Sequence, residues 1–141
     1  MAGGVKLEPT EMATQGIGFT PESLIRAICA VKCSPFTLRL LAELAENGVP
    51  LKAIAHPEGT QNQYLTRAVG LTSAENCLLW LVQVGVLRRE VDGQGITDSF
   101  RLTPLGFRIL EQWRSQGSFP APTWGDRLRN FLAKIQISQF L

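Results

Sequence analysis

The first third of the chain has apolar residues at helical spacing. Thr20-Pro21-Glu22 is typical of a helix start, with Thr20 as the N-cap and Pro21 at the first helical position. Ser34-Pro35 predicts a second start, and Asn47-Gly48 predicts its end. The apolar residues of the two segments are Leu24, Ile25, Ile28 and Val31, then Phe36, Leu40, Leu41, Leu44 and Ala45. We therefore expect two amphipathic helices.

The middle of the chain predicts shorter elements and then one long helix. Residues 50–55 and 60–69 are helical candidates, and Gly70 ends the second of them. The segment LTSAENCLLWLVQVG follows, with Thr72 or Ser73 as the expected N-cap and Gly85 as the end.

The last third predicts a hairpin, a helix, a linker and a final helix. Strands are expected over 87–91 and 99–102, joined by a turn through 92–95. Thr103-Pro104 starts the next helix, and residues 116–123 have a linker composition. These elements predict a flexible arm over 1–18, a folded domain over 19–115, and an amphipathic helix over 124–141 after the linker. One side of that helix carries Trp124, Leu128, Phe131, Leu132 and Ile135.

The stretch from 78 to 106 resembles the end of a winged helix-turn-helix domain of the MarR or PadR type. In that pattern a recognition helix ends at a glycine, and an arginine-bearing strand, a wing with aspartate and a strand ending in Leu-Thr follow. The matching residues are Leu78, Leu81, Gly85, Leu87, Arg88, Asp92, Asp98, Arg101, Leu102, Thr103 and Gly106. The resemblance covers about residues 34–114. It implies a mostly α fold with a small β-hairpin, namely a winged helix-turn-helix with additional N- and C-terminal helices.

The resemblance implies a protein that binds double-stranded DNA and regulates transcription, and it leaves two assignments of the recognition helix open. The helix over 73–84 precedes the wing and is favoured by chain order. The outer face of this helix carries no basic side chain, whereas the segment 60–69 is richer in polar groups. Candidate DNA contacts from both segments are Gln61, Gln63, Arg67, Thr72, Ser73 and Asn76. Candidate phosphate contacts in the hairpin are Arg88, Arg89 and Arg101.

Charge and composition add little to this hypothesis. The chain has 141 residues and a net charge of +2, so no global electrostatic attraction to nucleic acid is expected. Residues 1–86 carry six basic and seven acidic side chains, and residues 87–141 carry eight and five. The wing turn DGQGITD has two acidic side chains and no basic one. Because the minor groove has a negative potential, this composition does not suit insertion into it.

Chemistry-bearing residues are sparse. Cys29 and Cys33 lie four residues apart on a predicted helix and raise the possibility of a redox or metal sensor, but we expect them to be small buried side chains. His56 is the only histidine and follows no catalytic pattern. We therefore expect that the protein is not an enzyme and that it has no metal site and no cofactor.

Partners other than DNA form the alternative interpretation. The near-neutral charge and the acidic wing turn favour a winged-helix adaptor that binds another protein or sits in a larger complex. Candidate interface residues, for this partner or for a homodimer, are Trp80, Trp113, Trp124, Leu128, Phe131, Leu132 and Ile135. The absence of a long apolar run and of a signal sequence predicts a cytoplasmic protein without membrane association.

Overall fold

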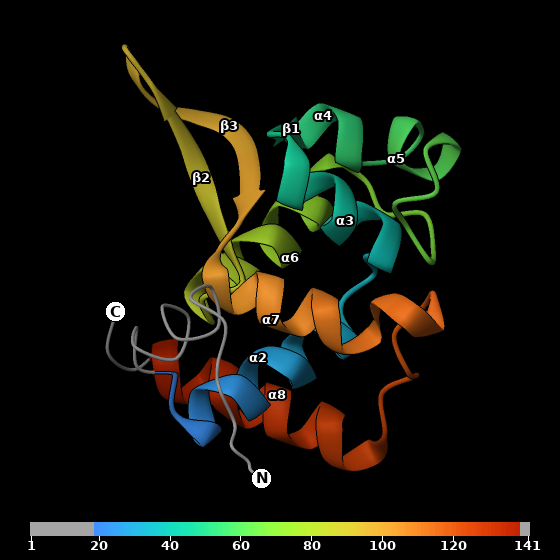
Figure 1. Ribbon diagram of the computed structural model, residues 1–141, viewed down its shortest axis with the longest axis vertical. Coiled ribbons are helices and arrows are strands. Elements are labelled where there is room, and N and C mark those ends of the chain that lie inside the picture. Colours follow the sequence, from blue (N-terminus) through green and yellow to red (C-terminus); the bar gives the residue numbers. More distant parts are fainter. Residues whose placement is uncertain (1–18, 139–141) are drawn as a thin grey trace, which may run out of the picture.

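The structure is a computed structural model that describes residues 19–138. The described part is mostly helical, with one small antiparallel sheet (Figure 1). The predicted arm over 1–18 and the end of the last predicted helix, 139–141, lie outside the described residues. The elements in order are α2 (Pro21–Cys33), α3 (Leu38–Glu46), β1 (Val49–Pro50), α4 (Leu51–Ile54), α5 (Glu58–Gln61), α6 (Leu71–Gln83), β2 (Leu87–Asp92), β3 (Gly95–Leu102), α7 (Pro104–Trp113), the 3-10 turn η1 (Arg114–Gln116) and α8 (Trp124–Ser138).

The predicted hairpin is confirmed and belongs to a three-stranded sheet in the order β1-β3-β2. Val49 pairs with Phe100 and Pro50 with Ser99, so the short strand β1 forms one edge. An edge is where proline fits a sheet, because its nitrogen has no hydrogen to donate. The register of β2 shifts between Arg89 and Val91, and the outer half of the hairpin projects from the body (Figure 1).

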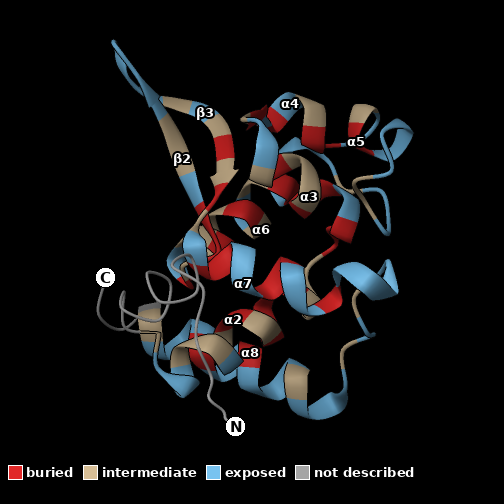
Figure 2. Cartoon of the chain, in the orientation of Figure 1, coloured by how far each residue is buried: buried red, intermediate tan, exposed pale blue. Residues whose placement is uncertain are grey.

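One hydrophobic core joins α2, α3, α4, α6, α7 and the base of the sheet (Figure 2). Thr103 connects α7 to the turn after α6. Its hydroxyl accepts from the amide of Gly106 at 3.1 Å and lies within hydrogen-bonding distance of the carbonyl oxygens of Gly85 and Val86. A Cβ at Gly106 would lie 2.5 Å from the Val86 carbonyl oxygen, so the close packing of α7 on this turn requires glycine.

Helix α8 lies along α2 on the side of the core away from the sheet (Figure 1). Its inner face carries Asp126, Asn130 and Ala133, at the spacing i, i+4, i+7. Asp126 Oδ2 lies 2.8 Å from Lys32 Nζ of α2, and Asn130 Oδ1 accepts from Trp80 Nε1 of α6 at 2.8 Å. Polar contacts and small side chains therefore hold α8 on the body.

The structure corrects three expected helix bounds. Helix α3 begins at Leu38 with Thr37 as its N-cap, because Ser34 ends α2. The predicted helix over 60–69 is wrong, since only Glu58–Gln61 is helical there. Helix α6 starts after Gly70, and neither Thr72 nor Ser73 is its N-cap.

Candidate nucleic-acid interface

The first turns of α6 present a polar, exposed surface. Thr72, Ser73 and Asn76 are all exposed, whereas Ala74 and Leu78 point into the core. The helix has Gly70 at its N-cap, no side-chain cap and no acidic residue in its first turn. Amide groups at such an end lack partners inside the helix, and the helix dipole makes the end electropositive. This end of α6 can therefore receive a phosphate as well as the edge of a base.

The base of the hairpin lies next to this end of α6. Arg89 Nη2 of β2 is 3.8 Å from Glu75 Oε2 of α6, and the Arg89 guanidinium lies 5.6 Å from the centre of the Phe100 ring. Arg88 is exposed and forms no ion pair within residues 19–138. The structure thus brings Arg89 close to the exposed polar end of α6. Arg88, the preceding residue of β2, lies on the opposite face of the strand and forms no ion pair within the described residues.

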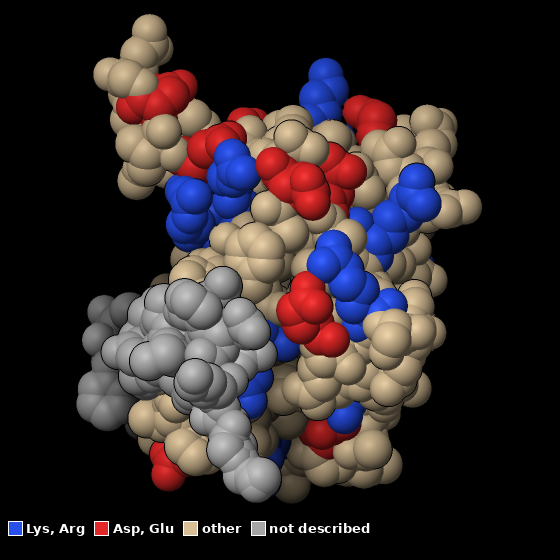
Figure 3. Space-filling model, in the orientation of Figure 1, with Lys and Arg blue, Asp and Glu red and all other residues tan. Residues whose placement is uncertain are grey.

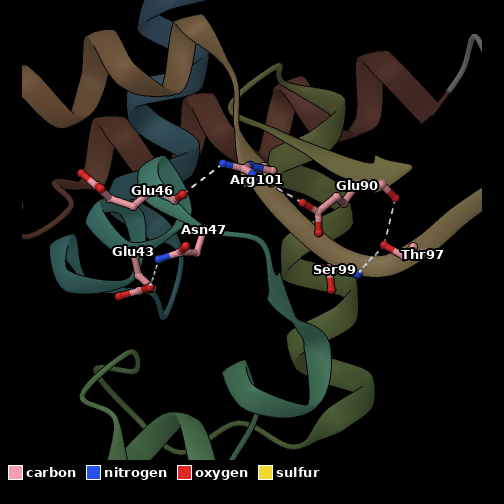
Figure 4. A network of polar contacts seen from close by, with 7 residues as sticks. All are labelled: Glu43, Glu46, Asn47, Glu90, Thr97, Ser99 and Arg101. Atoms are coloured by element: carbon pink, nitrogen blue, oxygen red, sulfur yellow. Dashed lines mark hydrogen bonds and ion pairs between the residues drawn. The ribbon is translucent and has the colours of Figure 1, made fainter. Parts of the chain in front are cut away.

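Arg101 lies opposite Arg88 in the sheet but is held by the protein itself (Figure 4). Its Nη1 forms an ion pair with Glu90 Oε2 at 3.2 Å, and its Nη2 donates to the carbonyl oxygen of Glu46 at the end of α3 at 3.1 Å. A Cβ at Gly48 would fall within 2.1 Å of the Glu90 carboxylate, so glycine makes room for this pair. Arg101 therefore acts as a brace between α3 and the hairpin.

The two carboxylates that pair with hairpin arginines are not evident from the sequence. Glu75 precedes Arg89 by fourteen positions and Glu90 precedes Arg101 by eleven, so neither pair has a helical spacing that a sequence pattern would reveal. The available signal was that Glu90 lies two residues after Arg88 and therefore on the same face of β2.

The tip of the hairpin carries acidic and apolar side chains. Asp92 and Asp98 are exposed, and the cross-strand partners Val91 and Ile96 expose 65% and 71% of their surface. Figure 3 shows red but no blue side chains at this tip, whereas both signs are mixed around its base. The positive charge of the hairpin therefore lies at its base, on Arg88, Arg89 and Arg101.

The other three candidate DNA residues lie away from the hairpin. Gln61 ends α5, and Gln63 and Arg67 belong to the irregular segment before α6; all three are exposed. Figure 1 has the hairpin at the upper left and α5 at the right. The structure therefore divides the predicted set into α6 with the hairpin stem and a second group around the segment 62–70.

That segment is fixed by contacts with residues far away in the chain. Thr37 donates from its hydroxyl to the Gln63 carbonyl at 2.8 Å and from its amide to the Tyr64 carbonyl at 3.0 Å. Phe36 pairs with Leu65 in an isolated antiparallel bridge, and Gln63 has a positive φ of 63°. Residues 62–69 are therefore not helical, and the segment 60–69 cannot serve as a recognition helix.

The predicted protein-interface residues differ in how far they are exposed to solvent. Trp113 is only 7% exposed and packs edge-on against Phe119 at 5.6 Å, so it is a core residue and not a surface residue. Trp80 is half-buried under α8 by its bond to Asn130. The other five lie on the face of α8 opposite its contacts with the body, and the exposed fractions are Trp124 85%, Leu128 52%, Phe131 58%, Leu132 53% and Ile135 41%. We call this set the α8 stripe.

Cys29 and Cys33 lie where α2 meets α8, whereas Cys77 lies in α6. Burial, followed by the hydrogen bond to Asp126, raises the pKa of the Cys29 thiol to about 11. Burial also raises the pKa of Cys33. A thiolate is the form that binds metals and reacts with oxidants, so both environments oppose that chemistry. No group of three or more metal-ligating side chains occurs among the described residues.

Within residues 19–138 no helix has both the length and the apolarity needed to cross a membrane.

Comparison with known proteins gives one family. Neither the curated proteins nor the solved structures provide a match to the chain. The model of the Npun_F0494-like family matches residues 17–134, which run from just before α2 to near the end of α8 and include the whole candidate interface. Because this match spans most of the sequence, the chain belongs to the Npun_F0494-like family.

Proposed function

We propose that the chain is a non-enzymatic winged-helix protein that binds double-stranded DNA and regulates transcription as a dimer. The observation that carries this proposal is the juxtaposition of the uncapped, polar end of α6 with the base of a projecting hairpin, where β2 contacts α6 through Arg89 and exposes Arg88. One surface then offers helix amides, short polar side chains and a cation. Protein–DNA interfaces use these groups for phosphates and base edges.

The order of elements supports the winged-helix interpretation. Helix α6 ends at Gly85, the arginine-bearing strand β2 follows, and β3 ends in Leu102-Thr103. Helices α3, α4 and α6 and the strand β1 complete a unit in which β3 is the central strand. This agrees with the pattern that residues 78–106 resemble.

The roles follow from position. Thr72, Ser73 and Asn76 enter the major groove at the start of α6, where the early residues of a recognition helix meet base edges. Arg88 contacts the phosphate backbone, and Arg89 positions α6 through Glu75. Arg101 has a bracing role, because its guanidinium is already bound by Glu90 and Glu46.

A pair of charge-matched variants tests the proposal. Arg88→Ala removes an exposed cation at the hairpin stem, and Arg114→Ala removes an exposed cation at the far end of α7. We expect Arg88→Ala to weaken binding to any duplex and to lower the slope of log K against log salt by about 1, because one phosphate contact is lost. Arg114→Ala should leave both unchanged. Equal effects of the two variants would remove α6 and the hairpin from the interface.

The second copy in the proposed dimer binds the α8 stripe. Trp124, Leu128, Phe131 and Leu132 together expose on the order of 500 Å² of apolar surface, at the upper end for a patch on a monomer. Two-fold pairing of this face with itself would bury about 1,000 Å², which reaches the lower limit of a specific interface. Since α8 ends a winged-helix unit, such pairing would give two copies of α6 related by symmetry.

A second candidate function rests on the tip of the hairpin. Val91 and Ile96 expose an apolar pair flanked by Asp92 and Asp98, which is better suited to a protein surface than to a minor groove. An adaptor of this kind would bind its protein partner through the tip. Val91→Ser with Ile96→Ser would then abolish that binding and leave duplex binding unaffected, whereas a DNA-inserting tip would lose duplex affinity.

A further inference from the structure

A pocket of about 710 Å³ lies between the body and the α7–α8 connection, away from the hairpin. Its size falls within the range of small-molecule sites. Three segments form most of it, namely the junction between α2 and α3, the irregular segment before α6, and residues 117–122, and α8 contributes Arg127. Among the described residues, the charged members of its lining are Lys32, Arg39, Arg67 and Arg127, and none of the lining residues is acidic.

Three of these four basic side chains form no ion pair with another described residue. Lys32 is neutralised by Asp126 at 2.8 Å. Arg39, Arg67 and Arg127 are exposed, and none of them has an ion pair or a hydrogen bond within residues 19–138. By contrast Arg89, Arg101 and Arg114 are each paired with a carboxylate. Three free guanidinium groups around one pocket, with no carboxylate in its lining, create a site of positive potential.

The backbone adds to this potential. Leu38 and Arg39 line the pocket and form the first turn of the nine-residue helix α3, which contains no acid in that turn. The Thr37 hydroxyl caps the amide of Leu40, so the amides of Leu38 and Arg39 have no partner inside the helix. Both the side chains and the end of α3 therefore favour an anion.

Two walls of the pocket are rigid, and the third is apolar. The Phe36–Leu65 bridge and the bonds from Thr37 to Gln63 and Tyr64 fix residues 34–38 against 63–67. Residues 117–122 contribute Phe119, Pro120 and Pro122, and Phe119 is anchored on Trp113. A ligand that fills the pocket therefore has a charged end and an apolar body.

We propose that this pocket binds a small phosphate monoester with an apolar or ring-shaped body. The phosphate lies among Arg39, Arg67 and Arg127, and the body packs against Phe119 and the prolines. A phosphate has three acceptor oxygens and close to two negative charges, which match three guanidinium groups, whereas a single carboxylate satisfies only one. This inference does not depend on DNA binding.

Calorimetric titration of the full chain tests this proposal, with phenyl phosphate as the probe and with inorganic phosphate and phenol as its two halves. We expect phenyl phosphate to bind more tightly than either half. Arg39→Gln with Arg67→Gln should weaken its binding by about tenfold or more, because two charge-assisted contacts are lost. Arg108→Gln with Arg114→Gln is the control of equal charge, because both residues are exposed and outside the pocket lining, and it should bind as the wild type does.

The folding of both variants is checked by thermal denaturation, where no large change is expected because Arg39 and Arg67 are exposed and unpaired. The proposal is overturned if phenyl phosphate does not bind at millimolar concentration or binds the Arg39 and Arg67 variant equally well. Phenol binding as tightly as phenyl phosphate also overturns the proposal. So does loss of duplex DNA binding in that variant without any binding of phenyl phosphate by the wild type, since the arginines would then serve DNA.

Discussion

Replacing Asp126 with asparagine removes the charge that fastens α8 to the body. The carboxylate lies 2.8 Å from Lys32 Nζ, accepts from the Thr123 amide at 2.8 Å, and is within 3.5 Å of the Cys29 sulfur. The side chains of Asp126 and Lys32 are only 16% and 15% exposed, so solvent screens this pair little. Asparagine keeps the size of the side chain but leaves the Lys32 ammonium without a counter-charge.

The expected loss is about 2–3 kcal/mol of unfolding free energy at neutral pH. A hydrogen bond to a charged group contributes about 1.5–3 kcal/mol, and breaking a fully buried ion pair costs about 3–5 kcal/mol. Because the side chains of Asp126 and Lys32 are partly exposed to solvent, we expect the loss of unfolding free energy to fall near the lower of these two ranges. For a chain of this size the melting temperature should fall by roughly 4–10 °C.

The stabilisation by Asp126 depends on pH, and the shift in its pKa gives the direction of this dependence. Lys32 and then the Thr123 amide hold the pKa of Asp126 well below its usual range. The stabilisation is therefore fully present above the unfolded pKa of about 4 and is lost as the pH falls toward the folded pKa. The difference in stability between wild type and Asp126→Asn should narrow below about pH 4.

Urea denaturation at pH 7 and at pH 3 measures both effects, with Asp98→Asn as the control. Asp98 is exposed on the hairpin and forms no ion pair within the described residues. Equal stabilities of the two variants at pH 7, or a difference that does not change with pH, would refute the role given to Asp126.

Three other substitutions test the packing and the α8 stripe. Gly106→Ala places a Cβ 2.5 Å from a backbone carbonyl oxygen and should cost about 2–3 kcal/mol in a urea titration, whereas Gly125→Ala, whose nearest atom is 3.7 Å away, should cost nothing. Trp113→Ala empties part of the core and should cost about 3–5 kcal/mol, whereas Trp124→Ala should not change stability; the reverse order would contradict the packing of the two residues. Phe131→Glu should convert the proposed dimer to a monomer in sedimentation equilibrium, and a wild-type mass of one chain would exclude the dimer.

Local signals in the sequence were sufficient for elements that local contacts determine. Thr20 accepts from the Ser23 amide at the start of α2, and Thr103 accepts from the Gly106 amide at the start of α7, in both cases just before a proline. Such a cap needs only residues within one turn, so its pattern is visible in the sequence. The hairpin is similar, since its two strands are joined by a short turn.

Elements determined by distant contacts could not be predicted in this way. The polar segment 60–69 has an irregular backbone because Phe36 and Thr37 bind it from about thirty positions away. Strand β1 has two residues, one of them the proline at which the sequence predicts a helix over 50–55, and it exists only by pairing with β3. In both cases tertiary pairing overrides local propensity.

The candidate site was predicted in part for the same reason. The spacing of Trp124, Leu128 and Phe131 correctly gave one face of a helix, but spacing does not tell whether that face is buried or exposed. Here Asp126 and Asn130 occupy the inner face and turn the apolar stripe outward. The pairing of Arg89 and Arg101 with carboxylates depends on the packing of β2 against α6 and of β3 against α3, which no spacing reveals.

The central claim is that α6 and the hairpin stem form a surface for duplex DNA. Fluorescence anisotropy of the purified chain with a labelled random duplex, at about 50 mM and 200 mM salt, tests it most directly. We expect binding at the lower salt that weakens with a log–log slope of several units, because phosphate contacts release counterions. No binding at 50 mM salt would contradict the claim and favour a protein partner for this surface.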